Sequence, residues 1–89
     1  MTFARWFTGL ADRRARARVL VRIRRLGLGN PGDLRPIGEG VVELRIHYGP
    51  GYRVYLVRRG AGLMVLLTGG TKRTQERDIR VAVKLARNL

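Results

Sequence analysis

Three apolar segments in the middle of the chain are separated by short turns rich in glycine. The segments span residues 41–48, 52–59 and 62–68, and a Gly-Pro-Gly turn at 49–51 joins the first two. Strands joined by turns this short pair with their neighbours in the chain, antiparallel to them. The pattern therefore predicts an antiparallel meander. Segment 62–68 is expected to be the central and most buried strand, because it is apolar on both faces.

Amphipathic segments flank these predicted strands. Apolar residues recur with helical spacing over residues 3–10, 11–26 and 74–89, and Asp12 is placed to cap the second of these helices. A short strand is expected at residues 34–37, at a sheet edge because it contains a proline. We therefore expect an α+β fold, in which two N-terminal helices pack on an antiparallel sheet of three to four strands and a C-terminal helix follows.

The chain is short and strongly basic. Its 89 residues suit a single domain spanning 1–89, and 19 Lys and Arg against 6 Asp and Glu give a net charge of +13. Such a charge attracts phosphate backbones, anionic membranes or an acidic protein. Because cysteine is absent and His47 is the only histidine, we expect no disulfide, metal site or cofactor. The longest apolar run is too short for a bilayer and the N-terminus lacks a secretory core, which favours a cytoplasmic protein without a membrane partner.

Charged residues alternate with apolar ones in the first long strand. Side chains on a strand alternate between its faces, so Glu43, Arg45 and His47 are expected on one polar face. If the tyrosines on either side of the turn pair, Arg53 of the next strand emerges near His47. Such a face is also typical of an exposed sheet surface with cross-strand ion pairs, for example between Glu43 and Arg53. The hairpin therefore predicts either a functional cluster or a solvated sheet face.

A second basic cluster follows the last predicted strand. Gly69 and Gly70 come after that strand and lead to Lys72 and Arg73, directly before the C-terminal helix. Backbone amides and the helix dipole at such a start favour an anion, and two cations strengthen that preference. This cluster predicts a site for an anion such as phosphate.

Three stretches of the chain carry a family pattern: DRRARARVLVRIRRLGLGNPGD, GEGVVELRIHYGPGYRVYLV and LLTGGTKRTQERDI. Together they resemble the RelE/ParE toxin superfamily over nearly the whole chain, and within it the HigB-like addiction module killer branch. The resemblance implies a RelE-like fold with helices packed on one side of a twisted antiparallel sheet. It also implies the toxin of a type II toxin–antitoxin system. Such a toxin is held inactive in a hetero-oligomer by a cognate antitoxin, which is acidic or a small helix-turn-helix protein.

The resemblance also assigns roles to single residues. Many superfamily members are mRNA endonucleases that act on the ribosome and need no metal. Arg45 and Arg53 match the sheet arginines of these nucleases. Lys72 matches the basic residue after their last strand, and Arg73 lies where they place a further arginine. We therefore expect mRNA and the ribosome as partners.

RNA cleavage by such a site needs a base and an acid as well as cations. Glu43 and His47 are both candidates for the base that activates the 2′-hydroxyl of the RNA. Lys72 is the candidate acid for the leaving oxygen. Nuclease members often carry a tyrosine or histidine near the C-terminus, and residues 76–89 contain neither. We therefore expect the ribosome to contribute to the rate by holding the mRNA in an in-line geometry.

Two other functions stay open. ParE-like members inhibit DNA gyrase without cutting RNA, and such a protein would act through its surface helices and C-terminal segment. A basic module that only binds nucleic acid needs no active site, and its affinity falls steeply with salt. The endonuclease alone requires Arg45, Arg53 and Lys72 together on one face.

Overall fold

The computed structural model describes all residues from Met1 to Leu89. The elements are α1 Phe3–Thr8, α2 Arg13–Gly27, β1 Leu34–Gly38, β2 Val41–Ile46, β3 Tyr52–Arg59, β4 Leu63–Thr71, the short 3₁₀ turn η1 Lys72–Thr74, and α3 Gln75–Arg87. The predicted order of elements is confirmed, and every predicted boundary lies within three residues of the observed one. None of the helices combines the length and apolar character that a membrane crossing requires.

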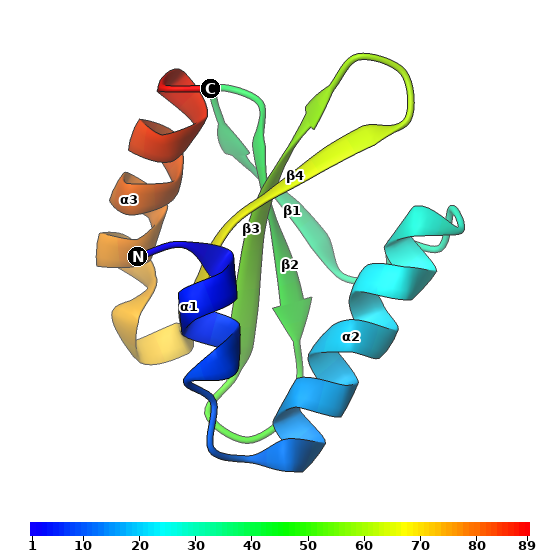
Figure 1. Cartoon of the computed structure of the whole chain (residues 1–89), viewed down its shortest axis with the longest axis vertical. Helices are drawn as coiled ribbons and strands as arrows, with labels where there is room; N and C mark the ends of the chain where they lie inside the picture. The colour runs from blue at the N-terminus through cyan, green and yellow to red at the C-terminus, as the bar shows by residue number, and fades with distance from the viewer.

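The four strands form one antiparallel sheet in chain order, β1-β2-β3-β4 (Figure 1). The predicted meander is confirmed, but the prediction that the last strand is central was wrong. Consecutive hairpins leave the last strand at an edge, and β4 pairs with β3 alone. β3 is instead the most buried strand, since all residues from Tyr52 to Val57 are buried. β4 is apolar on both faces because helices cover both faces of its C-terminal half.

Helices cover the sheet on both sides and create two cores. α1 and α2 lie over one face, where Leu44 and Val54 pack with Val19. α3 lies over the opposite face, where Tyr55 packs with Ala82. Figure 1 shows α2 and α3 on opposite sides of the sheet. The packing of the two N-terminal helices on the sheet is confirmed. The expectation that the helices lie on one side was wrong, because β3 has apolar residues on both faces and both need cover.

The register of the central hairpin differs from the expected one. Arg45 pairs with Arg53 and the strands end one pair later, so residues 47–51 form the loop. The tyrosines that flank the turn are therefore not strand partners, although their rings stack with centroids 6.5 Å apart. As a result, Arg53 lies opposite Arg45 rather than beside His47.

The two glycines of β4 permit close packing on both faces of the sheet. A methyl group at Gly69 would lie less than 3.0 Å from the Trp6 ring of α1, and one at Gly70 would lie less than 3.0 Å from the Asp78 carboxylate of α3. The expectation that these glycines follow the strand was wrong, because β4 continues to Thr71. Both glycines lie within β4, and their small size lets α1 and α3 pack closely against the strand.

Asp12 caps α2 as the sequence predicts. Its Oδ1 accepts hydrogen bonds from the backbone amides of Arg14 at 2.9 Å and Ala15 at 3.2 Å. Its Oδ2 accepts one from the Tyr48 hydroxyl at 3.2 Å, which ties the start of the helix to the central hairpin. The hydrogen bond from Ala15 is the first cause that holds the pKa of Asp12 below its ordinary value.

Asp12→Ala is expected to lower the Tm at pH 7 by roughly 5 °C, the usual effect of a lost N-cap in a domain of this size. The pKa of Asp12 is lower in the folded chain than in the unfolded chain. The cap therefore stabilises the fold fully above about pH 4 and is lost as the pH falls through the lower folded value. Thermal unfolding of both proteins at pH 7 and near pH 2 measures this. If the difference in Tm between the two proteins is the same near pH 2 as at pH 7, this prediction is wrong. Asp12→Asn is the control, because its side-chain amide keeps a hydrogen-bond acceptor.

Candidate functional site

Arg45 of β2 and Arg53 of β3 lie side by side on the face of the sheet that α3 covers. They are direct cross-strand partners, and such partners point to the same face. The Arg45 side chain is 31% exposed and that of Arg53 only 10%. The Nε atoms of both side chains have no hydrogen-bond partner. Two adjacent guanidinium groups, one of them open to solvent, favour the binding of an anion.

The turn of the hairpin joins these arginines to the end of β4. The carbonyl oxygen of Gly51 accepts hydrogen bonds from Nη1 of Arg53 at 2.8 Å and from the backbone amide of Lys72 at 2.9 Å. Gly51 has a φ of +78°, and a methyl group there would lie 3.2 Å from Nη1 of Arg53. Only glycine suits this position. One carbonyl group therefore holds Lys72 next to Arg53.

Lys72 and Arg73 are exposed and begin a hollow at the start of α3. The hollow has a volume of about 500 Å³ and no hydrophobic residue lines it. Arg77 and Arg80 of α3 add two further cations, and Glu76 is its one acidic residue. An anion in this hollow meets four basic side chains and the N-terminal turn of a helix.

Glu43 is completely buried next to Arg53. Its Oε2 accepts hydrogen bonds from the Tyr55 hydroxyl at 2.9 Å and from the Gln75 side-chain amide at 2.8 Å, and it lies 3.5 Å from Nε of Arg53. Burial, together with the hydrogen bond to Glu43, raises the pKa of Tyr55, so its hydroxyl remains a donor. The ion pair expected on an exposed sheet face is present, but it is buried beneath α3. Glu43 therefore fixes the position of Arg53 and presents no surface to a substrate.

His47 lies two residues beyond Arg45, and 72% of its side chain is exposed. Its Nε2 is 2.5 Å from Oδ2 of Asp33, and the same carboxylate oxygen is 3.5 Å from Nε of Arg45. The hydrogen bond from His47 is the first cause that holds the pKa of Asp33 below its ordinary value. The backbone carbonyl of Asp33 also accepts a hydrogen bond from the Arg45 amide at 2.9 Å. Asp33 thus connects His47 with Arg45.

Residues 5–88 match the family described as Phage derived protein Gp49-like (DUF891). The chain belongs to this Gp49-like family. A protein of Haemophilus influenzae named "Uncharacterized protein" is 46% identical to the Gp49-like chain over 89 residues, which is 100% of this chain and 90% of the relative. No solved structure matches it. The Gp49-like family is linked to toxin–antitoxin systems, which implies an antitoxin partner.

The structure of this Gp49-like chain brings the predicted site residues together only in part. Arg53 has Arg45 on one side and Lys72 on the other, and Arg73 follows Lys72. His47 was expected beside Arg53, but the observed register places Arg45 there instead.

Asp33 is the residue of the site that sequence reasoning missed. It lies in the segment Gly29–Asp33, whose composition indicates only a loop. The position of Asp33 could have been found only from the pairing register of the short edge strand β1. Because Leu34 pairs with Leu44, Asp33 falls opposite Arg45 and within reach of His47.

Proposed function

We propose that this Gp49-like protein is the toxin of a type II toxin–antitoxin system and that it cleaves mRNA on the ribosome without a metal. The observation that carries the proposal is the row of cations formed by Arg45, Arg53 and Lys72, which the sheet and the Gly51 carbonyl hold in place. Cations held in advance stabilise the charge that develops on a reacting phosphate. Membership of the Gp49-like family and the resemblance to RelE/ParE toxins support the same function.

The proposed reaction uses the 2′-hydroxyl of the RNA as nucleophile. Its oxygen forms a bond to the adjacent phosphorus, while the bond from phosphorus to the 5′-oxygen of the next nucleotide breaks. The hydroxyl proton passes to Nδ1 of His47, whose Nε2 is held by Asp33. The leaving oxygen takes a proton from the ammonium group of Lys72. The products are a 2′,3′-cyclic phosphate and a 5′-hydroxyl end.

The arginines stabilise the extra negative charge on the phosphate. Arg45 and Arg73 have exposed surface and contact the phosphate oxygens. Arg53 is mostly buried and adds its charge from within the sheet. Glu43 is completely buried and cannot contact the RNA, so it does not act as the general base. Its role is to hold Arg53 in position.

Lys72→Ala is the sharpest test of this site. The side chain is exposed and the backbone hydrogen bond to Gly51 is kept, so the Tm should not change. We expect cleavage of mRNA on translating ribosomes to fall by about 10²–10⁴-fold, the usual contribution of a general acid, and growth arrest to be lost. Lys84→Ala is the matched control, since it removes the same charge from an exposed position of α3 outside the hollow. Equal activity of the parent and Lys72→Ala would contradict the assignment.

The reaction products separate this function from its rivals. We expect fragments with 2′,3′-cyclic phosphate ends on ribosomes and negligible cleavage of naked RNA, because the ribosome holds the mRNA in line. Efficient cutting of free RNA would contradict the ribosome dependence. If growth arrest occurs without cleavage and DNA gyrase is inhibited, the protein is a gyrase inhibitor and the proposed endonuclease function is wrong. If the protein binds nucleic acid in a salt-sensitive manner but neither cleaves mRNA nor inhibits gyrase, it is a basic module that only binds nucleic acid.

The proposed partner is a small helix-turn-helix antitoxin that forms a hetero-oligomer with the toxin. A surface with a net charge of +13 attracts nucleic acid indiscriminately, and an acidic partner neutralises it.

A further inference from the structure

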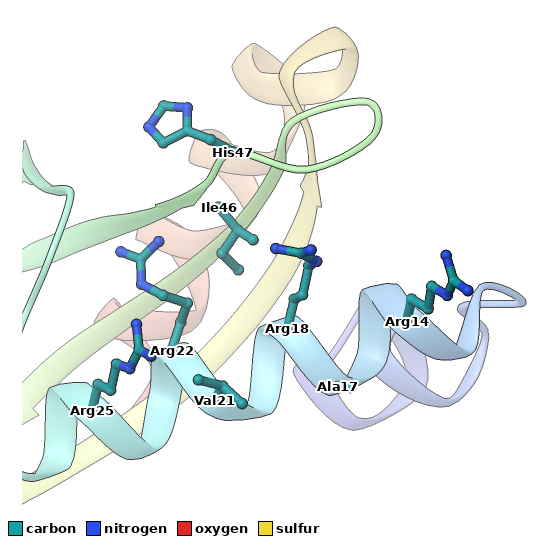
Figure 2. Close-up of a pocket in the computed structure, with 8 residues that line it drawn as sticks. All are labelled: Arg14, Ala17, Arg18, Val21, Arg22, Arg25, Ile46 and His47. Atoms are coloured by element: carbon teal, nitrogen blue, oxygen red, sulfur yellow. The ribbon is translucent and has the colours of Figure 1, made fainter.

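A groove of about 520 Å³ lies between α2 and the end of β2, on the face of the sheet opposite α3. Figure 2 shows Arg18, Arg22 and Arg25 on the same side of α2, with their guanidinium groups directed toward the strand. Ile46 points toward the helix between them, and His47 lies on the strand side of the groove. Of these residues only His47 belongs to the site described above.

The arginines of α2 form no salt bridge within the chain. The helix carries seven arginines and no acidic residue. Arg22 donates a hydrogen bond to a backbone carbonyl of β2 at 2.6 Å, and Arg18 lies 4.5 Å from the centre of the Tyr48 ring. Arg14 and Arg25 line the groove without contacts of this kind. The groove therefore presents positive charge that no salt bridge neutralises.

Three apolar residues, Ala17, Val21 and Ile46, also line the groove. Val21 is 46% exposed. The phosphates of a nucleic acid would pair with the arginines but leave these apolar side chains in water. A helix with acidic residues on one side and apolar residues on the other covers both.

We propose that this groove binds an acidic amphipathic helix of a partner protein, which lies along α2 and covers His47. The arginines at 14, 18, 22 and 25 are three or four residues apart, about 4.5–6 Å along the helix axis. Carboxylates three or four residues apart on a partner helix have the same spacing, so several charge pairs form together. The control of activity through His47 rests on the proposed function, whereas the binding itself does not.

Isothermal titration calorimetry with the full chain tests the binding. The probe is a synthetic helical peptide of about 15 residues, as long as α2, with glutamates on one face and leucines on the adjacent face. A peptide of the same composition in scrambled order is its control. We expect the helical peptide to bind at least about tenfold more tightly than the scrambled one, and to shift the NMR signals of Val21 and His47.

Two pairs of charge reversals locate the binding site. Arg14→Glu with Arg25→Glu changes groove residues and should weaken binding of the helical peptide at least about tenfold. Arg13→Glu with Arg24→Glu makes the same charge change on exposed positions of the same helix outside the groove. This control pair should weaken binding less than about threefold. Circular dichroism shows whether both variants keep the parent fold.

Several results would overturn the inference. Equal weakening by both variant pairs would mean attraction by net charge alone. Binding of single-stranded polyuridine RNA that only the groove variants lose, without binding of the peptide, would make the groove a nucleic-acid surface. Undiminished cleavage on ribosomes by the peptide-bound protein would refute the covering of His47. If the peptide binds as expected but the protein cleaves no mRNA, the proposed function fails and the groove assignment stands.

Discussion

Gly69→Ala is expected to lower the Tm by roughly 4–24 °C. The new methyl group would lie less than 3.0 Å from the Trp6 ring. That ring is itself packed against Tyr52 and Phe3, with centroids 6.2 Å and 5.8 Å away, so it cannot move without displacing α1 from the sheet. Overpacking of this kind costs about 1–3 kcal/mol, a large share of the stability of so small a domain. Thermal unfolding followed by circular dichroism measures the loss.

Gly70→Ala should act on the opposite face and cost somewhat less. Its methyl group would displace the Asp78 carboxylate, which is 6% exposed and accepts a hydrogen bond from the Thr74 hydroxyl. A carboxylate shifts more easily than an indole ring. Gly27→Ala is the control, because nothing lies within 4 Å of a methyl group there and alanine favours the helix. If both strand variants melted within a degree or two of the parent, the close approach of the helices to β4 would be refuted.

Arg53→Ala is expected to lower the free energy of unfolding by about 3–5 kcal/mol. Arg53 provides the charge nearest to Glu43, with Nε 3.5 Å from a carboxylate that is completely buried. Its removal leaves that negative charge in the protein interior with only neutral donors. Urea denaturation measures the loss. Reduced toxicity of this variant would therefore report lost stability as well as the proposed phosphate binding, which makes Lys72 the cleaner probe of the proposed activity.

A double-mutant cycle separates the charge from the packing of the side chain. Glu43→Gln removes the buried charge, so the variant with both Glu43→Gln and Arg53→Ala should be more stable than Arg53→Ala alone. Arg45→Ala is the matched control on the neighbouring strand, and its cost should stay near or below about 1 kcal/mol because its ion pair is partly exposed. A double variant no more stable than the single one would show that an unpaired charge is not the cause.

Local patterns account for the elements that the sequence predicted well. Alternation of apolar residues and the Gly-Pro-Gly turn placed β2 and β3, and Asp12 marked the start of α2. The position of β4 in the sheet and the side that α3 covers depend on packing between distant segments. An apolar strand fits the centre of a sheet as well as an edge between two helices, so its composition cannot separate the two cases.

In the candidate site, too, local patterns predict some features, whereas others depend on contacts between distant segments. The two-residue period of a strand places Arg45 and Glu43 on one face, as observed. That Glu43 is buried depends on Gln75, which lies 32 residues further along the chain. The role of His47 depends on Asp33, 14 residues before it. Neither contact leaves a periodic signal, because each is formed by elements that meet only in the folded protein.

The hydrogen bond between the Gly51 carbonyl and the Lys72 amide links the proposed site to the order in which the chain is synthesised. A nascent chain that ends with β3 already contains Arg45 and Arg53, but it lacks Lys72 and the Gln75 amide that helps hold Glu43. Its cations are present without being positioned. The proposed site is therefore complete only after the last strand and helix have joined the sheet, and a partner protein made at the same time can reach the chain before that point.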